Sequence, residues 1–245
     1  RNHQLARPGN QRLYLTMLDT LLFVVLPYVA LVLFFLVGIA RYRNRPFSVS
    51  SLSSQFLENK QHFWSTVPFH YGILGVLAIH LAGLLIPDAI LSWNAVHARL
   101  LFLEVTGLAF GLITLFGLLN SMLRRIRFAR LAVVTNRSDW VLLALLLAQI
   151  VLGILVSIYN GWGSSWFATS ASPWLWSLFT LSPDITYVAA MPLLVKLHMI
   201  NAWLIIGYFP FTRLIHVLVI PNPYLWRKTQ VVMWHRDRKS VRIKD

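Results

Sequence analysis

The sequence contains no cysteine among its 245 residues. Without thiolates, iron–sulfur clusters, cysteine-ligated haem, covalently attached c-type haem and disulfide bonds are all excluded. Any metal that this chain binds must therefore be held by histidine, carboxylate, methionine or tyrosine side chains.

Acidic residues are also scarce, because eight Asp and Glu stand against 22 Lys and Arg, a formal net charge of +14. Charged residues make up only 12% of the chain, whereas hydrophobic residues make up 57%, and the mean hydropathy is +0.63. A soluble domain usually carries about 25% charged residues. The basic residues lie in short segments beside apolar runs, so membrane topology accounts for them and no nucleic-acid partner is expected.

Five apolar runs are each long enough to cross the hydrocarbon core of a bilayer, about 30 Å thick, which takes about 20 helical residues. They cover residues 18–40, 63–86, 100–123, 140–159 and 187–220. Backbone groups in lipid must be hydrogen-bonded within the segment, so these runs are expected to be α-helices. The alternating pattern of a membrane β-barrel is absent. The sequence predicts an all-α integral membrane protein with five transmembrane helices in contact with membrane lipid.

The distribution of basic residues predicts the orientation, because Lys and Arg favour the cytoplasmic side. The segments after the first and third runs and the C-terminal tail are basic, whereas residues 161–186 contain neither Lys nor Arg. This pattern places the N-terminus outside and the C-terminus in the cytoplasm. We expect a polar N-terminal arm over residues 1–17, a transmembrane domain over residues 18–220 and a basic cytoplasmic tail over residues 221–245.

Four of the eight histidines lie inside apolar runs: His70 and His80 in the second, His198 and His216 in the fifth. A polar ring in hydrocarbon is costly and usually functional. A single one often only bonds a neighbouring helix, but two pairs on two helices fit the axial positions of two haem irons. Since the two helices run in opposite directions, depth matches His80 with His198 near the outer face and His70 with His216 near the inner face.

The histidine spacings also carry a geometric expectation. His198 and His216 are 18 residues apart, about five turns, so they would share one face of a continuous helix. The rise would be about 27 Å there, but about 15 Å between His70 and His80. We expect tilts or kinks near Pro68 and Pro210 to absorb the difference.

Residues next to these histidines are candidates for haem contacts. Gly72, Gly75 and Gly83 leave room for a flat macrocycle, although glycines serve helix packing equally well. Lys196 and Arg213 precede a histidine by two and three residues. Their charged groups could pair with haem propionates. Alternatively, their long side chains extend so that the charge lies at the membrane interface.

Four tryptophans lie between the fourth and fifth runs: Trp162, Trp166, Trp174 and Trp176. Tryptophan favours the headgroup level of a bilayer. We expect these side chains to form an interfacial belt or a short amphipathic segment on the outer side.

Two segments resemble the gamma, or cytochrome b, subunit of respiratory nitrate reductases. They are HYGILGVLAIHLAGLLIP, residues 70–87, and KLHMINAWLIIGYFPFTRLIHVLVIPNPYLWRKTQ, residues 196–230. The ten- and eighteen-residue histidine spacings match as well, and the likeness covers most of residues 18–230. The resemblance implies two b-type haems, the outer one held by His80 and His198 and the inner one by His70 and His216.

The resemblance further implies a bacterial or archaeal cell-membrane anchor for two cytoplasmic partners, an iron–sulfur subunit and a molybdenum catalytic subunit. It implies quinol oxidation near the outer haem, with protons released outside and electrons passed inward. Members that oxidise quinol can carry a lysine after the second helix. The best local match, NAVHARLL, places His97 there with Arg99 close by, and both side chains can donate a hydrogen bond to a quinone.

Alternative functions differ in direction or in class. A nitrite-oxidising relative would use the same haems to deliver electrons towards the membrane, and the outer partner need not be a quinone. A proton-coupled transporter would use the histidines as a relay, although no inverted repeat is visible in the sequence. A purely structural anchor leaves the four histidines unexplained.

Overall fold

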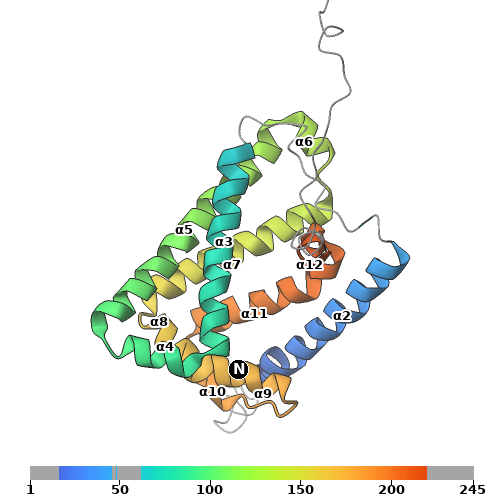
Figure 1. Cartoon of the computed structure of the whole chain (residues 1–245). Helices are drawn as coiled ribbons and strands as arrows, with labels where there is room; N and C mark the ends of the chain where they lie inside the picture. Colours follow the sequence, from blue (N-terminus) through green and yellow to red (C-terminus); the bar gives the residue numbers. More distant parts are fainter. Residues whose placement is uncertain (1–16, 46–47, 49–61, 220–245) are drawn as a thin grey trace, which may run out of the picture.

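The computed structural model describes residues 17–45, 48 and 62–219, and every element within them is helical (Figure 1). Five helices are long and apolar enough to span a membrane: Met17–Asn44, Phe63–Leu85, His97–Arg127, Arg137–Tyr159 and Leu193–Phe211. The prediction of an all-α chain with five such helices is confirmed. The predicted N-terminal arm, except Met17, and the predicted basic tail lie outside the described residues.

The elements follow one another in this order. The first span contains the π-helix η1 (Leu21–Val25) and α2 (Leu26–Asn44). Three further spans are α3 (His62–Leu85), α5 (His97–Arg127) and α7 (Arg137–Tyr159), joined by α4 (Pro87–Asn94) and α6 (Ala129–Val133). Then come α8 (Gly163–Trp166), η3 (Phe167–Ala171), α9 (Ser172–Phe179) and α10 (Thr186–Ala189). The chain continues with α11 (Leu193–Tyr208), η4 (Phe209–Phe211), η5 (Arg213–Ile215) and α12 (His216–Val219).

The five long helices pack in an order that differs from the sequence. α3 packs on α5, α5 on α7, α7 on α11 and α11 on α2. The short helices α8 to α10 lie at one end of the bundle and α6 at the other (Figure 1). We name these the α9 end and the α6 end. The charge pattern predicts that the α9 end faces outside and the α6 end faces the cytoplasm.

Small residues bring α3 and α5 into close contact. A methyl group at Gly117 of α5 would meet the backbone of Phe69, and one at Gly72 of α3 would meet Thr114. At Gly75 it would lie 2.5 Å from the Phe110 ring. Close approach at small residues is how helices associate in lipid, so the packing role left open for Gly72 and Gly75 has direct support.

The α9 segment is tied to the ends of two spans through tryptophan. Pro27 lacks the N–H that would bond the Phe23 carbonyl in a regular α-helix, and the Trp174 indole donates to this carbonyl at 3.1 Å. The Trp176 indole donates to Leu84 O near the end of α3 at 3.0 Å. Trp174 is 2% exposed and lies in the protein core, whereas Trp176 is 45% exposed. The short helix α9 therefore fits the expected amphipathic segment, and an interfacial belt does not include Trp174, which the hydrogen bond to Phe23 holds in the core.

The fifth run is interrupted near Pro210, where a kink was expected, but the interruption is a complete break, so His198 and His216 do not share one face of a single helix. Pro210 cannot donate a backbone hydrogen bond and its ring blocks the preceding turn, so α11 ends at Tyr208 and Thr212 is extended, with φ −111° and ψ 178°. Arg41 Nη1 donates to Pro210 O at 2.7 Å and to Thr212 O at 2.8 Å, which satisfies carbonyls at the break. His216 therefore begins a separate short helix. Pro68, by contrast, lies within a continuous α3.

Candidate functional site

The structure brings His80 of α3 and His198 of α11 together. Their ring centroids are 6.4 Å apart and the ring planes are inclined by 37°. Two metal–imidazole bonds of about 2.0 Å, together with the half-widths of two rings, span roughly 6 Å. The spacing fits two histidines that would hold one iron atom between them.

Three of the four membrane histidines share one hydrogen-bonding arrangement. In His70, His80 and His216 the ring Nδ1 lies 2.8, 2.8 and 2.6 Å from the carbonyl oxygen of a residue three or four positions earlier. A carbonyl only accepts, so each ring donates from Nδ1 and keeps a lone pair on Nε2. A metal-bound histidine uses its two nitrogens in this way, so these rings fit a haem iron.

His198 is held differently, from a neighbouring helix. Its Nε2 lies 3.2 Å from the amide nitrogen of Gln149 on α7, and its Nδ1 is buried without a hydrogen-bond partner. A methyl group at Gly153, one turn further along α7, would lie 3.0 Å from His198 Cε1. Gln149 and Gly153 therefore belong to the site, although the sequence reasoning missed both. A polar residue inside the apolar fourth run is the signal for Gln149; nothing local marks Gly153.

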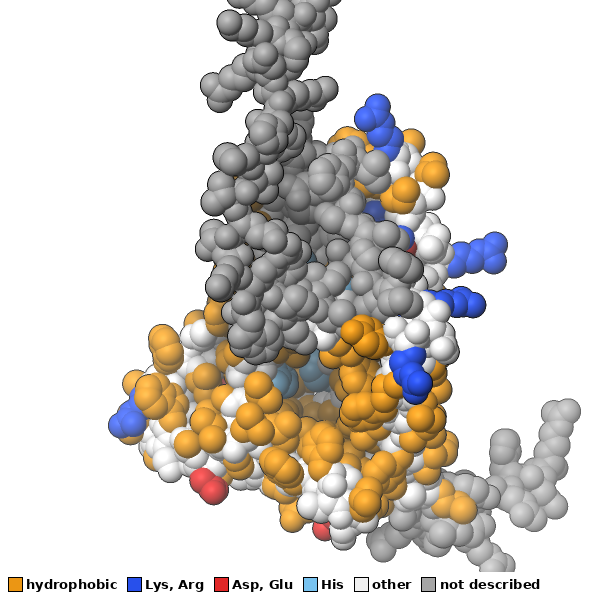
Figure 2. All heavy atoms as spheres, turned by 45° about the vertical axis from the view of Figure 1, so that its right-hand side comes forward, with side chains coloured by type: hydrophobic (Ala, Val, Ile, Leu, Met, Phe, Trp, Pro, Cys, Tyr) orange, Lys and Arg blue, Asp and Glu red, His pale blue; other side chains and the backbone are white. Residues whose placement is uncertain are grey.

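The surroundings of His80 come from the α9 end. The Phe167 ring of η3 packs edge-on against His80, with centroids 5.4 Å apart. A methyl group at Gly83 would lie 2.7 Å from Phe167, so Gly83 admits this aromatic side chain. A haem contact of Gly83 stays a prediction. Figure 2 shows histidine side chains at the back of a hollow with an apolar rim.

His70 and His216 lie towards the α6 end. His70 is exposed and its ring packs edge-on against Phe69 at 5.4 Å. Within the part of the chain that the structure describes, His70 and His216 make no ring contact like that of the other pair, so their pairing stays a prediction. Nearby, the buried Arg124 of α5 donates to Ser65 of α3 at 2.9 Å. This bond fixes α5 to the segment of α3 just before His70.

The two predicted propionate partners both bind carboxylates of the chain itself. Lys196 Nζ lies 3.0 Å from both Asp19 oxygens. Arg213 Nη2 lies 2.9 Å from Asp139 Oδ2, which also belongs to the capping box of α7. The cations therefore fix α11 to the first span and η5 to α7. Propionate contacts of Lys196 and Arg213 stay predictions, and each cation would have to be shared with its aspartate.

The two predicted quinone ligands lie at the α9 end, at the start of α5. Both side chains are exposed. The His97 ring faces Trp162 with centroids 5.8 Å apart, whereas the Arg99 guanidinium lies 5.4 Å from the centre of the Trp93 ring. The two side chains therefore pack against different tryptophans, His97 on the side of α8 and Arg99 on the side of α4.

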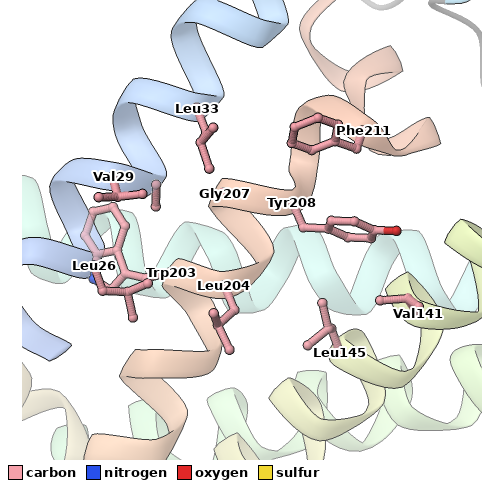
Figure 3. Close-up of a pocket in the computed structure, with 11 residues that line it drawn as sticks. Leu26, Val29, Leu33, Val141, Leu145, Trp203, Leu204, Gly207, Tyr208 and Phe211 are labelled. Carbon is pink, nitrogen blue, oxygen red and sulfur yellow. The ribbon is translucent and has the colours of Figure 1, made fainter.

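An apolar pocket of about 330 Å³ lies away from the histidines, between α2, α7 and α11 (Figure 3). Its lining includes Leu26, Trp203, Tyr208 and Phe211. It contains none of the predicted site residues. The described residues also contain no group of three or more His, Asp or Glu side chains suited to a bare metal ion. A haem iron needs only two protein ligands.

Comparison with known proteins gives the family. The model of the nitrate reductase gamma subunit family matches residues 19–235. The nitrate reductase gamma chain of Bacillus subtilis (strain 168) is 29% identical over 210 residues, 84% of this chain and 94% of that protein. The respiratory nitrate reductase 2 gamma chain of Escherichia coli (strain K12) is 29% identical over 225 residues, 89% of this chain and 98% of that protein. The respiratory nitrate reductase 1 gamma chain of the same organism is 28% identical over 220 residues, covering 88% and 97%. The chain belongs to the nitrate reductase gamma subunit family.

Proposed function

We propose that this chain is the membrane-embedded cytochrome b subunit of a nitrate-reductase-type complex. It carries electrons across the cell membrane of a bacterium or archaeon, from quinol at the α9 end to an iron–sulfur subunit at the α6 end. The observation that carries this proposal is the His80–His198 pair, whose 6.4 Å ring spacing suits a single iron between two helices. Membership of the gamma subunit family supports it independently.

The four membrane histidines would hold two b-type haems. His80 and His198 would hold the haem near the α9 end, and His70 and His216 the haem near the α6 end. Bound haem supplies one-electron transfer. The protein contributes the lone pairs on the ring nitrogens, and the backbone carbonyls that bond Nδ1 of three rings fix which nitrogen carries the lone pair.

Quinol would bind at the α9 end, where His97 is exposed beside Trp162. A quinone site needs apolar walls and a hydrogen-bond donor for the quinone oxygen. An imidazole can donate that hydrogen bond and can also take up a proton released when quinol is oxidised. Arg99 would only donate.

The α6 end would dock the iron–sulfur subunit, beyond which the molybdenum subunit would lie. Exposed arginines gather there from three helices: Arg127 ends α5, Arg130 lies in α6 and Arg137 begins α7. A positive surface at this end supports both the predicted cytoplasmic orientation and an acidic partner surface. The same arrangement would serve electron flow in the nitrite-oxidising direction.

Haem content of four single variants tests the proposal. The purified chain should show two low-spin b-type haems in a reduced-minus-oxidised spectrum. His80→Ala and His198→Ala should remove the same haem, and His70→Ala and His216→Ala the other. His97→Ala, which changes a histidine outside both pairs, should keep both. A chain without reducible haem would overturn the proposal in favour of a histidine relay, and loss of one shared haem in His70→Ala and His198→Ala would overturn the pairing.

A further inference from the structure

His198 depends on a side chain of another helix, unlike the other three membrane histidines. Its Nε2 faces the amide nitrogen of Gln149 at 3.2 Å, and its Nδ1 is buried with no hydrogen-bond partner. The other three rings each bond a backbone carbonyl of their own segment. The two rings of the outer pair therefore have different hydrogen-bonding surroundings.

A chain of hydrogen bonds fixes the orientation of the Gln149 amide. Asn201 Nδ2 donates to Leu145 O at 3.0 Å and to Gln149 Oε1 at 2.8 Å. Because the Leu145 carbonyl only accepts, the Asn201 atom facing it must be the amino group. The Gln149 atom that faces this amino group must then be its oxygen, which turns the Gln149 amino group towards His198. Asn201 is 8% exposed, so these bonds lie in the protein interior.

Iron ligation would change what His198 requires from Gln149. A ring that binds iron through one nitrogen carries its proton on the other, and this N–H needs an acceptor. The Gln149 amide is the side chain that contacts a ring nitrogen of His198, and its oxygen already accepts from Asn201. The oxygen has two lone pairs, so the ring would share it with Asn201 once the Gln149 amide turns its oxygen towards the ring. An acceptor that is shared forms a weaker hydrogen bond with the ring N–H than an unshared carbonyl does. The nitrogen that binds iron is then less basic.

We propose that Gln149 is the positioning residue of His198, and that Asn201, by occupying the Gln149 oxygen, raises the reduction potential of the outer haem. A less basic ligand stabilises the oxidised iron less, because outer hydrogen bonds tune ligand basicity and potential. This inference rests on the proposed function, in which His198 binds iron. Within the protein, the Asn201–Gln149 bond makes the outer haem a better electron acceptor.

Substitutions of Asn201 and Gln149, whose side chains are in contact, should change the reduction potential of the outer haem in opposite directions. Asn201→Leu frees the Gln149 oxygen for the His198 N–H, so the outer potential should fall. Gln149→Leu removes the acceptor, so the outer potential should rise. Redox titrations of the complete complex, followed by optical and electron paramagnetic resonance spectra, measure both haems at once. The inner haem is the internal control, and its potential should stay unchanged in both variants.

The results of these titrations distinguish a failure of this inference from a failure of the proposed function. A role confined to packing α7 against α11 would shift both variants in the same direction, or leave both potentials unmoved, and either result would overturn the inference. Where a leucine variant does not assemble, Gln149→Asn and Asn201→Ser repeat the test with polar side chains and the same expected signs. Failure of the proposed function looks different, because the unaltered protein would then lack the outer haem.

Discussion

At the scale of single residues, two cations are held by specific carboxylates, one in α11 and one in η5. Lys196 pairs with Asp19 and Arg213 with Asp139, and the side chains in these pairs are 10% to 22% exposed. Removing one partner of a buried pair leaves an uncompensated charge, which typically costs about 3–5 kcal/mol. These two pairs therefore fix helices in place whether or not a propionate shares the cation.

The exposed His97 gives a prediction at this scale. In His97→Ala, electron exchange between quinol and the outer haem should slow by about tenfold, the effect of losing one hydrogen bond to the substrate. Both haems should remain in place, since His97 lies outside the two pairs. Stopped-flow measurement of quinol-driven haem reduction gives the rate.

Arg99→Ala is the matched control, because Arg99 lies two residues away and packs on Trp93 instead of Trp162. It should slow the exchange less than His97→Ala does. An unchanged rate and normal inhibitor sensitivity in His97→Ala would remove His97 from the quinone site.

At the scale of secondary-structure elements, α3 carries two of the four histidines, and its place depends on α5. The contact is made at glycines, with Gly117 of α5 against the backbone of Phe69, the residue before His70. A backbone atom cannot turn aside as a side chain can. The position of His70 is thus set by the absence of a side chain on the neighbouring helix.

Gly117→Val tests this contact. Adding side-chain atoms to a packed contact typically lowers the free energy of unfolding by about 1–3 kcal/mol. Here the valine would push α3 away from α5 beside His70. We expect a lower thermal unfolding midpoint and loss of the inner haem before the outer one. Gly38→Val is the control, because a methyl group there meets nothing within 4 Å. Equal haem content in the two variants would show that the contact does not position His70.

At the scale of the whole molecule, the order of packing brings together segments that are far apart in the sequence. α2, the first spanning helix, packs on α11, the last long helix. Phe23, Trp174 and Trp203 meet in one core cluster that joins the first span, α9 and α11. The α9 end is therefore packed against the first and last long spans, and Phe167 of this end contacts His80.

The predicted basic tail gives a prediction at this scale, although it lies outside the described residues. Truncation after Asn222 removes all of its Lys and Arg residues, and we expect the chain to keep both haems but no longer co-purify with the iron–sulfur subunit. Haem spectra and pull-down of the complex measure the two properties separately. If the truncated chain assembles normally, the tail serves topology and lipid headgroups only.

Several features of this protein follow from the sequence by itself. The five spanning helices are predictable because hydropathy over about 20 residues is a local property. The four histidines stand out because an imidazole in hydrocarbon is costly without a purpose. Matching depths on antiparallel helices also led to the pairing of His80 with His198, the pair whose rings lie 6.4 Å apart.

Other features were decided only by tertiary structure. Pro210 was expected to bend a helix, but Arg41, far away in sequence, satisfies the carbonyls of a complete break, so His216 lies on a separate helix. Trp174 fits an interfacial belt by residue type. It lies in the core because its indole donates a hydrogen bond to the Phe23 carbonyl, which Pro27 four residues later leaves without its usual helical partner. Gln149 reaches His198 only because α7 packs on α11. In each case the deciding partner lies on a distant segment, and hydrogen bonds between distant segments leave no local pattern in the sequence.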